Sequence, residues 1–372
     1  MKRIIIIILS VIVIALLLIA LAFFLIYRTR IETIRTINRI TSYDDYNLYS
    51  IDIMYDYSLM DVIDYGIKDN QSFSDAIIKE AMPLLPVHVR MPEFGCSAFT
   101  VKTADGKALM GRNYDFKLDT SALLVRTQPK DGYRSIAFAA LDNINANEAD
   151  KNIRTKLTCL SAPFICLDGI NEKGVSIAVL TLDSSPTDQS GMDNGKKTIG
   201  TSLVIRLVLD YAATTEEAIA LLEEYNMFAT SGRDYHFYIT DASGDGRVVE
   251  FDCNSPDRKM TVTKSPAVTN FFIMYSDRVE PNQKNQQYGH GKERYEAIMA
   301  AMNEQKGKES IATAWDALKA SSQAPNPEDV TSNTQWSIVF SNTDKTADIS
   351  LKRRWDLSVL CSIDGITDII NR

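Results

Sequence analysis

The stretch FGCSAFTVKTADGKALMGRNYDF runs from Phe94 to Phe116. Its two flanks are rich in apolar and β-branched residues and predict two strands, and ADGK between them is a typical hairpin turn. The first strand begins with a single cysteine, Cys96, which stands between a glycine and a serine. Arg112 and Asp115 follow it after sixteen and nineteen residues. The pattern indicates either a nucleophile with charged partners or a small buried core residue beside a surface ion pair.

The composition is that of a globular protein without an obvious polyanionic partner. The chain has 372 residues, enough for one large catalytic domain and a smaller appendage. Its net charge of −8 gives no reason to expect nucleic acid. No Gly-rich phosphate loop follows a predicted strand, so the sequence does not indicate nucleotide binding. The sequence has three histidines and no CxxC spacing, so it does not indicate a Cys/His zinc site either. We therefore expect neither a metal nor an organic cofactor.

The N-terminus carries the longest apolar run. Residues 4–27 contain no charge and are long enough to cross a hydrocarbon core of about 30 Å. A cleaved signal peptide is the alternative, because Lys2 and Arg3 form a short basic start and the residues up to Ala22 resemble a cleavage site. The run continues past Ala22, so we favour a retained single-pass anchor in the cell membrane. The basic start favours a cytoplasmic N-terminus, although four arginines between 28 and 39 weaken that inference, and we expect the body outside the cytoplasm.

Two further regions follow the anchor. Residues 28–95 are expected to form a helical spacer or pro-segment, with isoleucines every third residue at its start and a short helix capped by Ser74. From Cys96 the pattern changes to strands, then two helices, the second capped by Thr215, then strands, two more helices and a final group of strands. Blocks of strands and helices in this order predict α+β layers with largely antiparallel sheets over residues 96–372.

A cysteine nucleophile needs a base, and the sequence offers two. His236 or His290 could pair with Cys96, although neither lies in a known local signature. Alternatively, cleavage of the Gly95–Cys96 bond would free an α-amine whose pKa is about 8 in model peptides. Gly95 has no side chain and leaves room for the thiol to attack its carbonyl. The remaining cysteines are expected to be core residues or disulfide partners: Cys159, Cys166, Cys253 and Cys361.

The stretch that starts at Gly95 resembles the beginning of the choloylglycine hydrolase family, which includes bile salt hydrolases, penicillin V acylases and related linear-amide C–N hydrolases. In that family the mature chain starts with cysteine, and an arginine and an aspartate follow at the spacings of Arg112 and Asp115. The resemblance covers about residues 95–372. It implies the four-layer αββα sandwich of the N-terminal nucleophile hydrolases.

Three later motifs are similar to the family in the same order. DGINEKGVSIAVL (168–180) matches the family's Asn-Glu-Lys-Gly turn and the strand after it. Asn270 ends a predicted strand in AVTNFF, and Arg294 lies near the start of the helix GKERYEAI, as the family requires. One position departs from the pattern. The family carries an asparagine or tyrosine that helps to bind the oxyanion, and direct counting places Thr181 there.

The resemblance implies a role for each matched residue. Cys96 would be the nucleophile through its thiol and the base through its α-amine. Asp115 would orient that amine, and Arg112 would favour the thiolate. Asn270 would donate a hydrogen bond to the oxyanion, with Thr181 as a candidate second donor. An arginine that supports the site electrostatically completes the set: Arg294.

These roles predict a self-processing cysteine amidase that cleaves the C–N bond of linear N-acyl amides through an acyl-cysteine. Conjugated bile acids, penicillin V, N-acyl homoserine lactones, and N-acyl amino acids or amines are all candidate substrates. Two alternatives stay open, namely an acyltransferase of the same fold and a non-catalytic surface protein that retained the fold. The expected partners are a small-molecule amide and the membrane, with no nucleic acid. Formation of a homo-oligomer and release of the body after processing are both left open.

Overall fold

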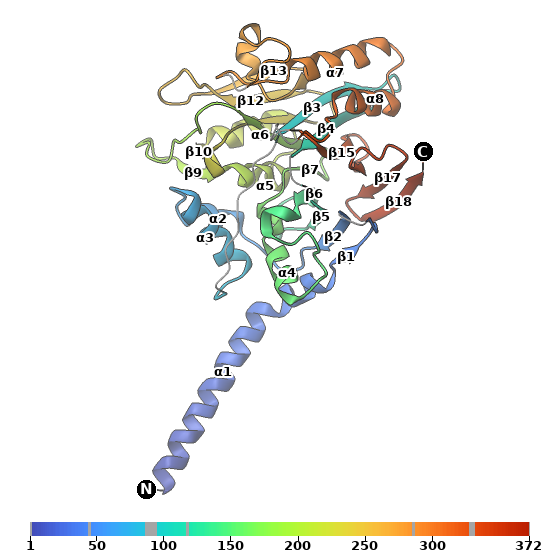
Figure 1. Cartoon of the computed structure of the whole chain (residues 1–372). Helices are drawn as coiled ribbons and strands as arrows, with labels where there is room; N and C mark the ends of the chain where they lie inside the picture. Colours follow the sequence, from blue (N-terminus) through green and yellow to red (C-terminus); the bar gives the residue numbers. More distant parts are fainter. Residues whose placement is uncertain are drawn as a thin grey trace.

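The hairpin predicted around ADGK is present, with β3 (Gly95–Lys102) paired antiparallel to β4 (Ala108–Asp115). Gly106 in the turn has a φ of 89°, a left-handed conformation that favours glycine. The hairpin belongs to one of two large sheets (Figure 1). The computed structural model describes residues 2–43, 46–85, 95–116, 119–284, 287–326 and 332–371.

Within these described residues the hairpin lies in a seven-stranded antiparallel sheet. Its strands β4 and β15 are buried along their whole length, as expected for strands covered on both faces. The order across this sheet is β14 (Ala267–Val268), β3, β4, β15 (Thr334–Ser341), β16 (Thr346–Leu351), β17 (Leu357–Ser362) and β18 (Gly365–Asn371).

The second sheet has nine strands in the described part of the chain and is antiparallel except where β2 runs parallel to β5. Its order is β1 (Asn38–Arg39), β2 (Leu48–Asp52), β5 (Ala122–Thr127), β6 (Ser135–Ala140), β7 (Asp168–Asn171), β8 (Ser176–Leu182), β11 (Asp234–Thr240), β12 (Arg247–Phe251) and β13 (Met260–Lys264). A small separate parallel pair is formed by β9 (Lys197–Gly200) and β10 (Tyr225–Phe228).

The two large sheets pack face to face, with β3 against β8, and helices cover both outer faces. On the nine-stranded sheet, α5 (Thr201–Tyr211) and α6 (Thr215–Glu223) lie over β7, β8 and β11. On the seven-stranded sheet, α7 (Lys292–Glu304) and α8 (Ile311–Ser321) lie over β3, β4, β14 and β15. The layers therefore run helix, sheet, sheet, helix, and the α+β class predicted from the sequence is confirmed.

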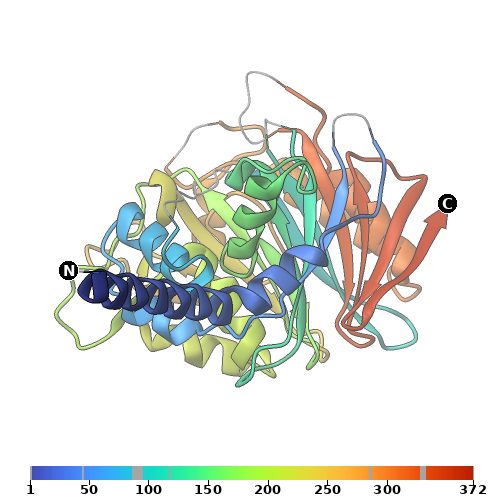
Figure 2. The same ribbon diagram turned by 90° about the horizontal axis from the view of Figure 1, so that it is seen from below.

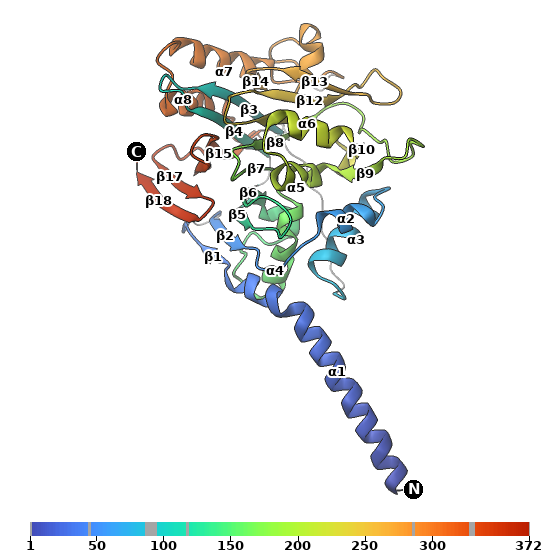
Figure 3. The same cartoon turned by 180° about the vertical axis from the view of Figure 1, so that it is seen from behind.

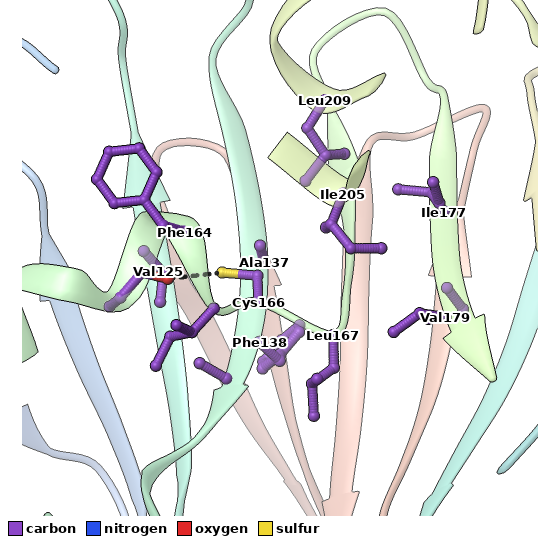
Figure 4. Packing of buried hydrophobic residues seen from close by; sticks show 14 of the residues in the cluster. Val125, Ala137, Phe138, Phe164, Cys166, Leu167, Ile177, Val179, Ile205 and Leu209 are labelled. Carbon is purple, nitrogen blue, oxygen red and sulfur yellow. Dashed lines mark hydrogen bonds between the residues drawn. The ribbon is translucent and has the colours of Figure 1, made fainter. Parts of the chain in front are cut away.

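The apolar core explains why α5 and the central strands are buried on all sides. Ile205 and Leu209 of α5 share one buried cluster with Ile177 and Val179 of β8 (Figure 4). Cys166 lies in the same cluster and donates a hydrogen bond to the Ala162 carbonyl at 3.2 Å. All five cysteines are free thiols, so the alternative of disulfide partners is wrong for the other four, and only Cys253 among them is not fully buried.

The N-terminal region differs from the expected helical spacer. The long helix α1 (Lys2–Arg35) projects from the body (Figures 1 and 3) and is long and apolar enough to cross a membrane, a property it shares with signal sequences. After it, β2 joins the nine-stranded sheet. The short helices α2 (Leu59–Asp64) and α3 (Asn70–Ala81) pack against each other and against the body (Figures 1 and 2). The segment is thus partly β-structure and belongs to the fold.

Two predicted helix caps are wrong by a few residues. Helix α3 begins after Asp69, whose carboxylate accepts from the backbone N–H of Ser72 in a capping box, so Ser74 lies inside the helix. Helix α6 is capped by Thr214 rather than Thr215, because the Thr214 hydroxyl accepts from the backbone N–H that follows three residues later. A further short helix not predicted from the sequence is α4 (Ile153–Thr158).

Candidate active site

Cys96 is the second residue of β3 and is fully buried. It lies directly opposite Tyr114 of β4, and Ala98 lies opposite Arg112. Since side chains alternate along a strand, Cys96 and Arg112 share the face that packs into the core, while Asp115 belongs to the other face. The predicted spacing of sixteen and nineteen residues therefore places the two charged partners on different sides of the strand.

The Arg112 guanidinium lies near enough to the Cys96 thiol to lower its pKa, and Arg112 is itself held by buried acceptors. Its Nε donates to the Asp168 carboxylate at 3.3 Å, and its Nη2 donates to the Val179 carbonyl at 2.9 Å. The indole Nε1 of Trp336 donates to the same carboxylate oxygen of Asp168 at 3.3 Å. This network fixes a cation next to the thiol.

The Cys96 thiol is protonated at neutral pH in the intact chain. Burial raises the pKa of Cys96 to about 12, although the neighbouring Arg112 guanidinium lowers it. The backbone nitrogen of Cys96 is an amide in the intact chain and cannot act as a base. The Cys96 thiol and its charged neighbour thus lie together while no basic group is present at the nitrogen.

Asn270 and Arg294 converge on the backbone of Cys96 from two segments far away in the sequence. The Cys96 N–H donates to Asn270 Oδ1 at 3.0 Å. Arg294 Nη2 donates to the same oxygen at 2.8 Å, and its Nη1 donates to the Cys96 carbonyl at 3.0 Å. Arg294 therefore ties the start of β3 to the asparagine, and all three residues are buried.

Asp115 completes this group on the other face of the strand. Its carboxylate lies 3.9 Å from Arg294 Nη1 and accepts from the Thr334 hydroxyl at 2.6 Å and from Gln323 Nε2 at 2.9 Å. Burial raises the pKa of the Asp115 carboxyl above its usual value, and Arg294 is the strongest opposing influence. The structure thus brings together all five residues that the sequence proposed for catalysis, while their roles stay predictions.

Thr181 contacts the site with its backbone carbonyl and not with its side chain. Its carbonyl accepts from Asn270 Nδ2 at 2.8 Å, so the amide group of Asn270 is held at both ends. The Thr181 hydroxyl donates to the Asp234 carbonyl at 3.3 Å. The candidate second oxyanion donor therefore has another acceptor in the intact chain.

Sequence reasoning missed Asp168, Gln323 and Thr334 as members of the site. Asp168 begins the segment DGINEKG, which was singled out as a motif without a role for its first residue. Its carboxyl is fully buried, and burial raises its pKa to about 6 against the lowering influence of Arg112. Gln323 and Thr334 gave no local signal, because their relation to Asp115 depends on how α8 and β15 pack beside β4.

The two histidines considered as bases have carboxylate partners of their own. Buried His236 pairs through Nδ1 with Glu250 at 3.1 Å, and half-buried His290 pairs with Asp183 at 2.6 Å. Glu250 also accepts from the backbone N–H groups of Ile273 and Met274. His236 thereby supports the segment that follows Asn270. Among the residues that the structure describes, no group of three His, Cys, Asp or Glu side chains is arranged to hold a metal ion.

Comparisons with known proteins bear on the family and the fold. The model of the family described as linear amide C-N hydrolases, choloylglycine hydrolase family, matches residues 96–270. Penicillin V acylase from Agrobacterium tumefaciens is similar in structure, with 18% identity over 74% of this chain and 86% of the other, at a TM-score of 0.50. Two variants of the conjugated bile acid hydrolase from Clostridium perfringens are 15% identical over 74% of this chain and 96% of theirs, at a TM-score of 0.54.

The layers and the cysteine at the start of β3 define an N-terminal nucleophile hydrolase fold. The match that starts at Cys96 adds the family resemblance: residues 96–270 match the choloylglycine hydrolase family, and the protein is a hydrolase of C–N bonds in linear amides. The resemblance predicted from the sequence is confirmed.

Proposed function

We propose that this protein is a self-processing cysteine amidase that hydrolyses linear N-acyl amides through an acyl-cysteine intermediate. The observation that carries the proposal is the set of contacts on the Cys96 backbone, where Asn270 accepts from its nitrogen and Arg294 donates to its carbonyl. Those contacts hold the nitrogen in place whether it is an amide or, after cleavage, an amine. Cleavage of a single bond would therefore supply the missing base without rearranging the site.

Processing begins when the Cys96 thiol attacks the Gly95 carbonyl carbon. The sulfur–carbon bond forms, the carbon–nitrogen bond breaks, and the thiol proton passes to the departing nitrogen of Cys96. Water then hydrolyses the thioester, which leaves a carboxylate on Gly95 and returns a proton to the sulfur. The products are a chain that ends at Gly95 and a chain that starts with a free α-amine on Cys96.

Amide hydrolysis repeats this chemistry on a substrate. The α-amine, with a pKa of about 8, takes the thiol proton while the sulfur attacks the substrate carbonyl. Asn270 Nδ2 has a second hydrogen that the Thr181 carbonyl does not use, and it would donate this hydrogen to the oxyanion. The amine then gives its proton to the leaving nitrogen, and water releases the acid from the sulfur. Arg112 stabilises the thiolate throughout.

We propose a linear N-acyl amide as the substrate. The family match supports this class, and the similar structures are those of a penicillin V acylase and a conjugated bile acid hydrolase. The fold is what those two structures share with this chain, so the acyl group and the amine of its own substrate are questions for a substrate panel.

We also propose three regions: an anchor over 1–27, a processed segment over 28–95 and the hydrolase over 96–372. The contacts of the segment favour its retention after cleavage. Strand β2 is hydrogen-bonded within the nine-stranded sheet, and the hydroxyls of Tyr55 and Tyr57 reach acceptors in the hydrolase. The processed enzyme would therefore consist of two chains held at the membrane, and release of the body is not expected.

The test is N-terminal sequencing and intact mass of the purified protein, combined with assays on a panel of N-acyl amides. Active wild-type protein should contain a chain that starts Cys-Ser-Ala-Phe. Cys96→Ala should accumulate as one full-length species without activity. Cys253→Ala, which removes a free and only partly buried thiol elsewhere, should process and react like the wild type. Full activity with an intact Gly95–Cys96 bond would refute the proposal.

A further inference from the structure

The long helix α1 joins the body without a flexible linker. Its last turn packs against the core, since Thr33 and Ile34 are buried. The Thr33 hydroxyl accepts from the backbone N–H of Met54 at 2.9 Å. The orientation of the helix relative to the body is therefore fixed by buried contacts, and the body cannot swing away from the end of the apolar run.

The same end of α1 is bonded to the end of α3. Arg30 Nε donates to the Ala81 carbonyl at 2.8 Å, and its Nη2 donates to the Glu80 carbonyl at 2.6 Å. A cation at the C-terminus of a helix also interacts favourably with its dipole. One turn earlier, the Tyr27 hydroxyl donates to the Pro83 carbonyl at 2.5 Å. The turn after α3 is thus held beside Tyr27 of α1.

The position of Tyr27 can be compared with a bilayer. The apolar run 4–27 is about 36 Å long at 1.5 Å per residue, slightly more than a hydrocarbon core of about 30 Å. Its last residue, Tyr27, therefore falls at the boundary between acyl chains and headgroups, where tyrosine is favoured. Pro83, which is hydrogen-bonded to Tyr27, must lie at the same depth.

The residue after Pro83 is Leu84, whose side chain is 79% exposed. A single exposed leucine is ordinary on a soluble surface. Here the depth of Leu84 gives its exposure a meaning, because an apolar side chain that is held at the headgroup–acyl boundary and is not covered by protein faces lipid. We propose that the turn Met82–Leu85 is a second membrane contact, with Leu84 inserted into the headgroup–acyl boundary beside α1. This inference rests on the proposed membrane anchor.

The consequence is a fixed pose of the enzyme on the bilayer. With α1 and the turn both in the lipid, the face that carries α3 lies against the membrane, and the α7–α8 layer faces away from it (Figure 1). A second copy of the chain covering Leu84 is the rival occupant, and the experiment separates it from lipid.

The experiment places tryptophan at three exposed apolar positions of the full chain reconstituted in phosphatidylcholine vesicles. Leu84→Trp tests the turn, Phe24→Trp marks the span, and Ile311→Trp marks the start of α8, where the side chain is 51% exposed. Each variant is compared with the wild type, whose three tryptophans give the background. Quenching is measured with brominated phosphatidylcholine and with aqueous iodide, and amide hydrolysis in detergent shows that each variant is folded.

We expect at least twofold quenching by brominated lipid of the added emission at positions 84 and 24, and at position 311 we expect quenching by iodide only. Shallow bromine positions should quench the emission at 84 more strongly than deep ones. If position 24 is quenched by lipid and position 84 by iodide, the anchor stands and the second contact is overturned. Protection of position 84 from both quenchers would assign it to a second copy and also overturn the inference. Absence of lipid quenching at both 24 and 84 would contradict the proposed membrane anchor itself.

Discussion

Tyr57 offers a sharp test of whether the segment before Cys96 belongs to the fold. Its hydroxyl lies 3.1 Å from both oxygens of the Asp210 carboxylate in the hydrolase, and both side chains are buried. Arg206 pairs with the same carboxylate at 2.8 Å. The ring of Tyr57 also packs edge-on against Phe164 at a centroid distance of 5.5 Å. Tyr57→Phe keeps the ring contacts and removes only the hydroxyl.

The size of the effect follows from these contacts. A hydrogen bond to a buried charged group contributes about 1.5–3 kcal/mol. We therefore expect Tyr57→Phe to lower the free energy of unfolding by about 2 kcal/mol, a change of about 30-fold in the equilibrium constant. Urea unfolding is measured in the Cys96→Ala background, where the protein is one chain. An unchanged m-value would show that the unfolding transition is the same.

The loss of unfolding free energy caused by Tyr57→Phe should depend on pH. The pKa of Asp210 determines whether this loss grows or shrinks as the pH rises. Burial raises the pKa of Asp210 to about 6, against the lowering effect of Arg206 and the Tyr57 hydrogen bond. A carboxyl with a raised pKa in the folded state binds its proton more tightly there, so its contribution to stability falls as pH rises from about 4 to about 6. The hydroxyl favours the charged form. The effect of Tyr57→Phe should therefore be larger at pH 7.5 than at pH 5.

The matched control is Tyr49→Phe. The Tyr49 hydroxyl lies 3.3 Å from Asp150, whose side chain is 33% exposed, so water can replace the contact. We expect a loss below about 1 kcal/mol, as for other solvated polar contacts. If Tyr57→Phe costs no more than this control at pH 7.5, the segment is not docked as described, and the two-chain enzyme becomes untenable.

Three further substitutions address the site. Asp168→Asn should cost about 3–5 kcal/mol of stability at neutral pH, because the buried Arg112 loses its carboxylate; an unchanged melting temperature would contradict this. Glu250→Gln should lower kcat about tenfold with KM unchanged, since it loosens the segment behind the candidate oxyanion donor, and a change confined to KM would speak against such positioning. Thr181→Val should lower kcat by less than tenfold, because the hydroxyl already donates to the Asp234 carbonyl; a loss of about 10²-fold would restore the hydroxyl as an oxyanion donor.

The sequence predicted the features that depend on local pattern or on fixed spacing. Alternation and the ADGK turn located β3 and β4, and helical periodicity located α5, α7 and α8. The five candidate site residues were found because the family spacing encodes a three-dimensional arrangement that no local pattern contains. Their convergence on the Cys96 backbone could be anticipated only through that resemblance.

The rest depends on contacts between distant segments. The sequence of strand β2 is an ordinary short apolar stretch. Nothing in it predicts that β2 pairs in parallel with β5, which begins more than seventy residues later. The parallel pair β9–β10 was missed for the same reason. Asp168 showed no sign of its partner, because Arg112 meets it only when the two sheets stack. The helix caps were misplaced because several Ser and Thr residues near each start could serve equally well.

Arg294 gives the clearest physical reason for a cysteine placed deep in the chain. Through one guanidinium it holds the carbonyl of Cys96, the side chain of Asn270 and, at longer range, the carboxylate of Asp115. These partners fix the position of the Cys96 nitrogen before it becomes an amine. A base created by cleavage would then appear already oriented, and orientation of a catalytic group is worth several orders of magnitude in rate. If the proposed cleavage occurs, the internal position would keep the assembled site silent until the Gly95–Cys96 bond is cut. It would also delay amide hydrolysis until residues 96–372 have folded onto the segment that precedes them.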